Sequence, residues 1–87
     1  MSILYRIYVE DVVAEASEIE RTVNVYLESF TVYHAIGSWK GKQETSLVIE
    51  AIDATAQRVY ACARELKVLL KQECVLITEQ AIEARFV

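Results

Sequence analysis

The sequence predicts an α+β fold in which four antiparallel strands form one sheet and two helices cover one of its faces. Segments with alternating apolar residues and segments with apolar residues every three or four positions follow one another as strand, helix, strand, strand, helix, strand. The only two glycines, Gly37 and Gly41, separate the second strand segment from the third and mark a hairpin. A chain of 87 residues without proline fits a single domain over residues 1–87.

The first strand is predicted over residues 3–9 and the first helix over residues 12–29. Side chains of a strand alternate between two faces, and here both faces are largely apolar. The helix carries one apolar stripe at spacings of three and four residues. Its members are Val12, Ala16, Ile19, Val23 and Leu27. Ser17 and Glu20 match the S-x-x-E capping box, so the regular helix begins either at Val12 or near Ser17.

The second and third strands are predicted to form a hairpin over residues 30–52, around which the rest of the chain is organised. The first arm, 30–36, is rich in β-branched and aromatic residues, and the second arm, 45–52, contains a Leu-Val-Ile run. The turn is predicted over residues 37–42, because two glycines within six residues supply backbone conformations that other residues resist.

The second helix is predicted over residues 54–71, with Asp53 as its N-cap. Its apolar stripe again has helical spacing. The stripe consists of Ala56, Val59, Ala63, Leu66 and Leu70. Lys67 and Lys71 lie near its C-terminal end, where positive charge suits the helix dipole.

The last strand is predicted over residues 74–78, a short and almost wholly apolar segment. Glu79 and Gln80 are expected to interrupt it. Residues 81–87 alternate again, so they either extend this strand after a bulge or form a separate fifth strand.

Right-handed crossovers assemble this order most simply into a ferredoxin-like βαββαβ sandwich with both helices on one face. The other face of the sheet is also apolar. Its predicted members include Leu4, Tyr8, Val48, Ile52, Cys74 and Leu76. The hydrophobic content of 54% exceeds the roughly 45–50% that is typical of soluble domains. We therefore expect this face to be covered by other copies of the chain in a symmetric homo-oligomer.

Composition argues against several classes of function. The net charge of −4 disfavours general nucleic-acid binding, which depends on neutralising phosphates. No apolar run approaches the ~20 residues that cross a bilayer, and no signal peptide is apparent, so no membrane partner and a cytoplasmic location are expected. Cys62 and Cys74, which lie in apolar contexts, are predicted to be buried free thiols that bind no metal.

The segment 37–50, GSWKGKQETSLVIE, resembles the hairpin of CutA proteins, which have a similar aromatic-x-x-Gly turn followed by an acidic residue and an apolar strand. The element order is also similar to the wider PII-like group. The resemblance implies a trimer whose sheets pack inward, and compact proteins of this kind also occur in bacteriophages. Tyr33 and His34 stand where CutA proteins usually have a cysteine-containing strand, and the long nucleotide loop of PII signalling proteins is absent.

The candidate ligand-binding residues gather around the hairpin. They are Tyr33, His34, Trp39, Lys40, Lys42 and Glu44. Trp39 could stack on a base while the two lysines pair with a phosphate, or it could anchor the tip on a neighbouring subunit. Glu44 would accept from a ligand hydroxyl or pair with the lysines, and Arg6 is a weaker candidate for the same pocket.

His34 is the only histidine of the chain. It could act as a general base, or contribute half a metal site with Glu44 or Glu50. One histidine without a nearby cysteine provides too few ligands for a specific zinc site within one chain, so an ordinary hydrogen-bonding role is expected instead.

Two classes of function remain open. The first is a homo-oligomer that binds or sequesters a small anionic molecule, such as a nucleotide, in clefts between subunits. The second is a structural or interaction protein that binds a protein partner. An enzyme comes third, because no catalytic motif such as G-x-S-x-G or H-E-x-x-H is present, and no cofactor or metal is expected.

Overall fold

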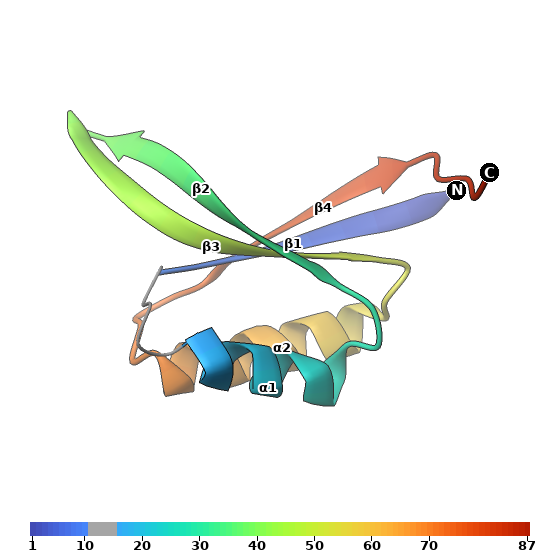
Figure 1. Cartoon of the computed structure of the whole chain (residues 1–87), viewed down its shortest axis with the longest axis horizontal. Helices are drawn as coiled ribbons and strands as arrows, with labels where there is room; N and C mark the ends of the chain where they lie inside the picture. The colour runs from blue at the N-terminus through green and yellow to red at the C-terminus, as the bar shows by residue number, and fades with distance from the viewer. Residues whose placement is uncertain (11–15) are drawn as a thin grey trace.

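A computed structural model describes residues 1–10 and 16–87 of the chain. Its elements follow the predicted order βαββαβ. They are β1 (Ser2–Glu10), α1 (Ala16–Tyr26), β2 (Thr31–Trp39), β3 (Lys42–Ile52), α2 (Ala56–Leu69) and β4 (Leu76–Ile82). The strands form one antiparallel sheet in the order β2-β3-β1-β4, and both helices lie on the same face of it (Figure 1). The predicted ferredoxin-like fold is therefore confirmed.

The core lies between the sheet and the two helices. Alternate residues of β1 and β3 point into it, and the buried stripe of each helix packs against them. The most completely buried side chains are Ile7, Ile19, Ile49, Leu66, Val9, Val23, Val48, Val59 and Cys62. Of these, Val48 alone points to the opposite face of the sheet, since it is outside the core cluster and pairs with Tyr8 of β1.

Both helices differ from their predicted bounds. The described part of α1 begins at Ala16 and ends at Tyr26, three residues before the predicted end. Ser17 lies inside the helix and is not its cap, and the predicted start at Val12 lies outside the described residues. Leu27 is still buried after the helix has ended, so the stripe continues into the connection to β2.

The N-cap of α2 is Thr55 and not Asp53. The Thr55 side chain accepts a hydrogen bond from the backbone N–H of Arg58 at 3.3 Å. Asp53 has a φ of 59°, and its carboxylate turns back to β1, where it accepts from the Ser2 hydroxyl at 3.0 Å and from the Ile3 backbone N–H at 3.2 Å. Asp53 therefore ties the end of β3 to the start of the chain.

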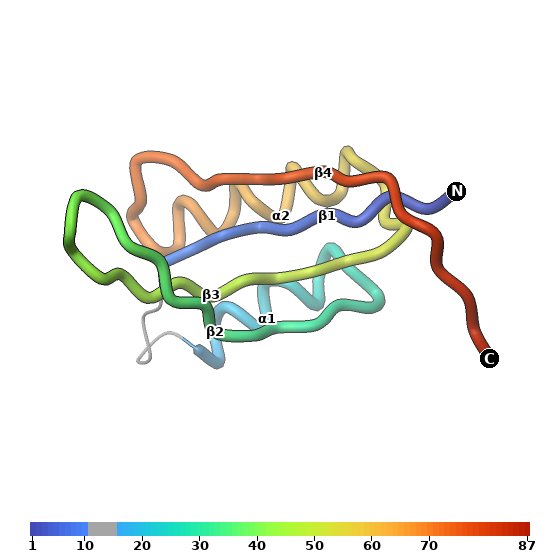
Figure 2. The backbone as a smooth tube through the Cα atoms, turned by 90° about the horizontal axis from the view of Figure 1, so that it is seen from above, coloured from blue at the N-terminus to red at the C-terminus, as the bar shows by residue number. Residues whose placement is uncertain are grey.

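The last strand, β4, runs without interruption through Glu79 and Gln80. Its register with β1 advances one residue at a time from Leu76 to Ile82, so the predicted bulge is wrong. Glu79 is accommodated because it lies at the sheet edge, where it accepts a hydrogen bond from the Tyr60 hydroxyl of α2 at 2.9 Å. Residues 83–87 leave the sheet as an extended tail and form no fifth strand (Figure 2).

The two cysteines lie in different environments. Cys62 lies on the inner side of α2 and is fully buried, whereas Cys74 precedes β4 and is exposed. The predicted burial of Cys74 is wrong because the strand begins two residues later than expected, at Leu76.

Burial raises the pKa of the Cys62 thiol from its ordinary value of 9.0 to about 11. The unfolded chain loses the thiol proton at a lower pH than the folded chain does. The contribution of this buried thiol to the free energy of unfolding is therefore fully present below about pH 9 and is lost as pH rises towards 11. We expect the melting temperature of the parent to fall more steeply across this window than that of Cys62→Ala. Thiol titration with Ellman's reagent should label Cys74 in the folded protein and Cys62 only after unfolding. Rapid labelling of both thiols in the folded protein would contradict this assignment.

Candidate functional site

The β2–β3 hairpin projects beyond the body of the molecule (Figure 1). Strand β1 pairs with β3 only as far as Ser46, so residues 42–45 of β3 pair with β2 alone. Every residue of β2 except Ala35 is exposed or nearly so, and the helices do not cover this end of the sheet. A two-stranded ribbon is marginally stable by itself in water, which makes this arm a natural contact surface.

The turn of the hairpin is tighter than predicted. It consists of Lys40 and Gly41 only, and both have positive φ, 49° and 80°. A two-residue turn with positive φ at both positions suits the right-handed twist of a hairpin. The ladder therefore extends to the pair Trp39 and Lys42. Gly37, which was predicted to be part of the turn, lies within β2 opposite Glu44.

The ladder divides the predicted site residues between two faces. Successive side chains of β2 alternate, so Tyr33 and Trp39 share the face that points away from the helices with Lys42 and Glu44 of β3. His34 pairs with Leu47, a core residue, and so lies on the reverse face. The half-site that would have combined His34 with Glu44 or Glu50 is therefore not assembled within one chain.

Trp39 ends β2 and is 64% exposed. The ammonium group of Lys40 lies 5.6 Å from the centre of the Trp39 ring, which is a cation–π contact. Lys42 faces Trp39 across the ladder. The tip thus brings together an accessible aromatic ring and two positive charges.

A shelf of small side chains separates the two rings of this face. Between Tyr33 and Trp39, β2 contributes only Ala35 and Gly37, which face Ser46 and Glu44 of β3. A Cβ atom added at Gly37 would meet no other atom within 4 Å. Trp39 lies six positions after Tyr33, and at about 3.3 Å per residue the shelf is roughly 20 Å long. We use the name hairpin shelf for the residues of this face, which are Tyr33, Ala35, Gly37 and Trp39 of β2 and Lys42, Glu44 and Ser46 of β3.

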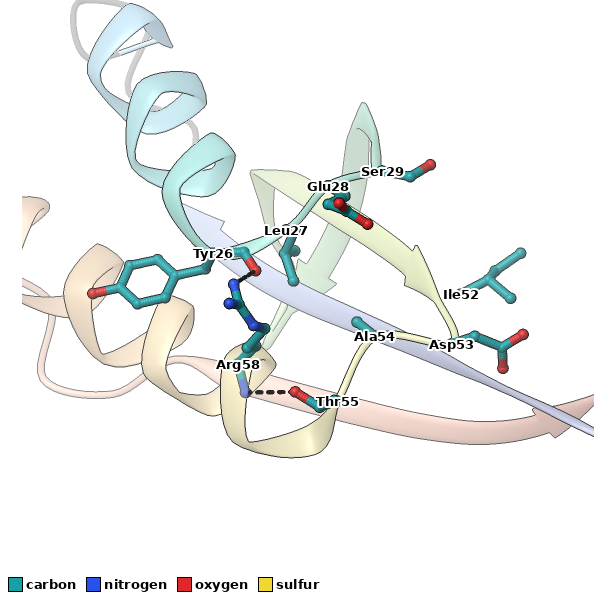
Figure 3. A pocket seen from close by; sticks show the side chains of 9 residues that line it. All are labelled: Tyr26, Leu27, Glu28, Ser29, Ile52, Asp53, Ala54, Thr55 and Arg58. Atoms are coloured by element: carbon teal, nitrogen blue, oxygen red, sulfur yellow. Dashed lines mark hydrogen bonds between the residues drawn. The ribbon is translucent and has the colours of Figure 1, made fainter.

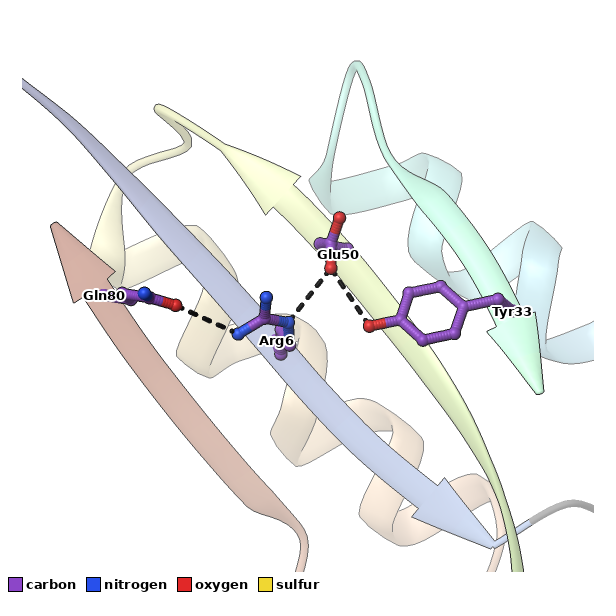
Figure 4. A network of polar contacts seen from close by, with 4 residues as sticks. All are labelled: Arg6, Tyr33, Glu50 and Gln80. Atoms are coloured by element: carbon purple, nitrogen blue, oxygen red, sulfur yellow. Dashed lines mark hydrogen bonds and ion pairs between the residues drawn. The ribbon is translucent and has the colours of Figure 1, made fainter. Parts of the chain in front are cut away.

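A polar network that was not predicted from the sequence crosses the middle of the same sheet face (Figure 4). Arg6 donates from Nε to Glu50 Oε2 at 3.0 Å and from Nη1 to Gln80 Oε1 at 3.3 Å. The Tyr33 hydroxyl donates to the same oxygen of Glu50 at 3.0 Å. The hydrogen bond to Glu50 is the main reason that the pKa of Arg6 is raised above its ordinary value. The register places Arg6 directly opposite Glu50, and this pairing of β1 with β3 cannot be read from the sequence alone.

Apolar side chains flank this network. We call the sheet face that points away from the helices the open face. It presents, besides the network, Leu4, Tyr8, Val48, Ile52 and Leu76. Val48 and Leu4 are already buried in a single chain, whereas Leu76 is 60% and Ile52 is 48% exposed. The predicted apolar second face is therefore present, with a polar row across its centre.

A hollow of about 420 Å³ lies between the end of α1 and the start of α2 (Figure 3). The Arg58 guanidinium spans it and donates to the backbone carbonyl of Tyr26 at 3.0 Å. Because the Arg58 guanidinium already joins the two helices across this hollow, we interpret the hollow as part of the packing between them and not as a ligand site.

The described residues contain no group of three or more histidine, cysteine or acidic side chains that could hold a metal ion. Within the same ranges, 1–10 and 16–87, no helix combines the length and apolarity needed to cross a membrane.

The sequence matches no protein-family model and no curated protein. The fold, however, is similar to that of several solved structures. A DUF3240 family protein from Shewanella baltica superposes with a TM-score of 0.69 and 14% identity, covering 99% of this chain and 94% of that one. The CutA divalent cation tolerance protein from Thermus thermophilus superposes with a TM-score of 0.62 and 14% identity, covering 99% and 88%.

A third similar structure is a phage SAM lyase in complex with S-methyl-5′-thioadenosine. Its TM-score is 0.64 at 21% identity, and the match covers 91% of this chain and 80% of that one. At such identities the likeness establishes the fold alone, and it confirms the CutA-like architecture that the hairpin sequence suggested.

Proposed function

We propose that the protein is a homo-oligomer that binds a small nucleotide-like molecule on the hairpin shelf, in a cleft completed by a neighbouring subunit. The observation that carries this proposal is the hairpin tip. A projecting ribbon ends in an exposed tryptophan ring with Lys40 against it and Lys42 beside it. Aromatic rings stack on bases, and lysine ammonium groups pair with phosphates.

Self-association is the first part of this proposal. The open face leaves Leu76 and Ile52 in contact with water although both helices are already used on the other face. Exposed apolar side chains on both sides of the polar row, on a sheet face that no helix covers, are typical of an interaction site. A second copy is the simplest occupant, and a closed ring of copies, most simply a trimer, is consistent with the inward-packed sheets that the family resemblance implies.

The second part concerns the ligand. The shelf between Tyr33 and Trp39 leaves room over Ala35 and Gly37, and Glu44 lies beside this space as an acceptor for a hydroxyl group. In one chain this surface is a ribbon without walls, so a neighbour must supply the other side of the cleft. His34, on the reverse of the ribbon, would then face whichever subunit packs there.

Binding should depend on the two lysines at the tip. We expect isothermal titration calorimetry to show that the parent binds ATP, and that Lys40→Glu with Lys42→Glu weakens binding by about 100-fold, because two charge-assisted hydrogen bonds are lost. The matched control is Lys67→Glu with Lys71→Glu, which makes the same charge change at exposed positions near the end of α2. Equal binding by the parent and the hairpin variant would remove these lysines from the site.

A second candidate function is an S-adenosylmethionine lyase. It is favoured by the fold shared with a phage SAM lyase whose structure contains S-methyl-5′-thioadenosine. That nucleoside carries no phosphate, and the rings and carboxylate of the shelf suit a base and a ribose. If this activity is present, incubation with S-adenosylmethionine should release S-methyl-5′-thioadenosine, which chromatography detects. In that case Glu44→Gln should reduce the rate of release more than Lys40→Glu with Lys42→Glu does.

The alternative of a structural or interaction protein predicts neither ATP binding nor the release of S-methyl-5′-thioadenosine. Affinity capture from a lysate, followed by denaturation and mass spectrometry of the released small molecules, separates the two classes. A co-purified small molecule supports the ligand-binding proposal, whereas a stoichiometric protein without a small molecule supports the alternative.

A further inference from the structure

We infer that the polar row on the open face, formed by Tyr33, Glu50, Arg6 and Gln80, continues from one copy of the chain to the next and fixes how the copies are arranged. This inference rests on the proposed self-association and adds to it the contact that determines its geometry.

The row has unused hydrogen-bonding capacity within one chain. A guanidinium has five N–H donors, and Arg6 directs only two groups, Nε and Nη1, to partners among the described residues. Both hydrogen bonds to Glu50 end on Oε2, so Oε1 accepts none within the described part of the chain. The hydroxyl of Thr78, opposite Arg6 on β4, is buried and also has no partner there.

Assembly would make this unused capacity costly. The charged pair is already partly shielded, with side-chain exposures of 28% for Arg6 and 26% for Glu50. Covering the open face would remove the remaining water, and buried charged groups need partners for their remaining donors and acceptors. A second copy carries the matching groups, because each copy has free guanidinium donors and a free carboxylate oxygen.

The row also has a direction. In the sheet order β2-β3-β1-β4, Glu50 lies towards the β2 side and Arg6 towards the β4 side (Figure 4). The unused guanidinium donors of Arg6 in one copy therefore complement the unused carboxylate oxygen of Glu50 in another copy, in a head-to-tail contact. Head-to-tail contacts close into rings of several copies when the rotation allows it. The row itself is neutral, so gathering several copies around it adds no net charge to the centre.

Exchange of the two charges tests this contact. In the double variant Arg6→Glu with Glu50→Arg, each chain keeps a pair of opposite charges but the direction of the row is reversed. We expect the variant to assemble with itself and not with the parent, since a mixed contact would place like charges together. Native mass spectrometry of unlabelled parent mixed with ¹⁵N-labelled variant should then show two unmixed populations. Labelled and unlabelled parent, as the control, should mix statistically.

Statistical mixing of the parent with the variant would overturn the inference, because it would mean that the pair acts only inside its own chain. A monomeric parent would instead refute the proposed self-association itself.

If the double variant does not assemble, Glu50→Gln provides the second test of the inference. We expect it to weaken association at least about 10-fold with an unchanged circular dichroism spectrum, because it leaves Arg6 without its counter-charge. Tyr33→Phe, which removes only a hydroxyl, should change association little, and parent-like association of Glu50→Gln would also overturn the inference.

Discussion

Replacing Leu66 by alanine should produce the largest loss of stability of any single substitution considered for this protein. Leu66 is fully buried at the centre of the stripe by which α2 packs on the sheet. Leucine-to-alanine changes at such sites remove transfer free energy and leave a cavity, and they cost about 2–5 kcal/mol. In a domain of this size, 1 kcal/mol shifts the melting temperature by about 4–8 °C. We therefore expect a fall of roughly 8–40 °C in a thermal melt.

The matched control is Val68→Ala, two residues further along the same helix. Val68 is 74% exposed, and surface substitutions usually change the free energy of unfolding by less than about 0.5 kcal/mol. Both variants must be compared at one protein concentration, because self-association makes the melting temperature depend on it. Similar melting temperatures for the two variants would contradict the packing of α2 described above.

The order and the inner face of each element could be predicted because they depend on local periodicity. The alternation in β1 places Ile7 and Val9 on one face, and both lie in the core; the helical spacing correctly placed Val59 and Leu66 on the inner stripe of α2. These assignments depend only on which side chains share a face. They need no knowledge of which strand lies next to which.

Element ends were predicted less well, because tertiary contacts decide them. Asp53 has the right chemistry for an N-cap, but its carboxylate bonds with Ser2 and Ile3, which are distant in sequence. Thr55 takes the cap position instead. Glu79 similarly looked like an interruption, yet it remains in β4 because Tyr60 of α2 supplies a hydrogen-bond donor.

The candidate site was predicted in part. The sequence identified the residues of the hairpin tip, but the placement of the turn at Lys40 and Gly41 fixes which face each side chain takes. A shift of one residue in register reverses every side chain of a strand. For this reason only the strand pairing seen in the structure shows that Trp39, Lys42 and Glu44 share one face. The same pairing separates His34 from them.

Replacing Trp39 by alanine should weaken self-association and lower the melting temperature together. An exposed tryptophan at the end of a projecting ribbon has little to contact within its own chain, and tryptophan is enriched among the residues that dominate interface energetics. An interface hot spot costs at least about 2 kcal/mol on truncation, which raises the dissociation constant roughly 30-fold. Sedimentation equilibrium over a dilution series measures this change directly.

Two comparison variants make the result specific to the ring. Trp39→Phe keeps an aromatic side chain at the same position and should retain most of the association. Val25→Ala removes an exposed side chain from α1, away from the hairpin, and should leave the dissociation constant unchanged. An unchanged dissociation constant for Trp39→Ala would place the tip outside the interface. The shelf would then be open to solvent along its whole length, and a ligand bound there would have to be held by one chain alone.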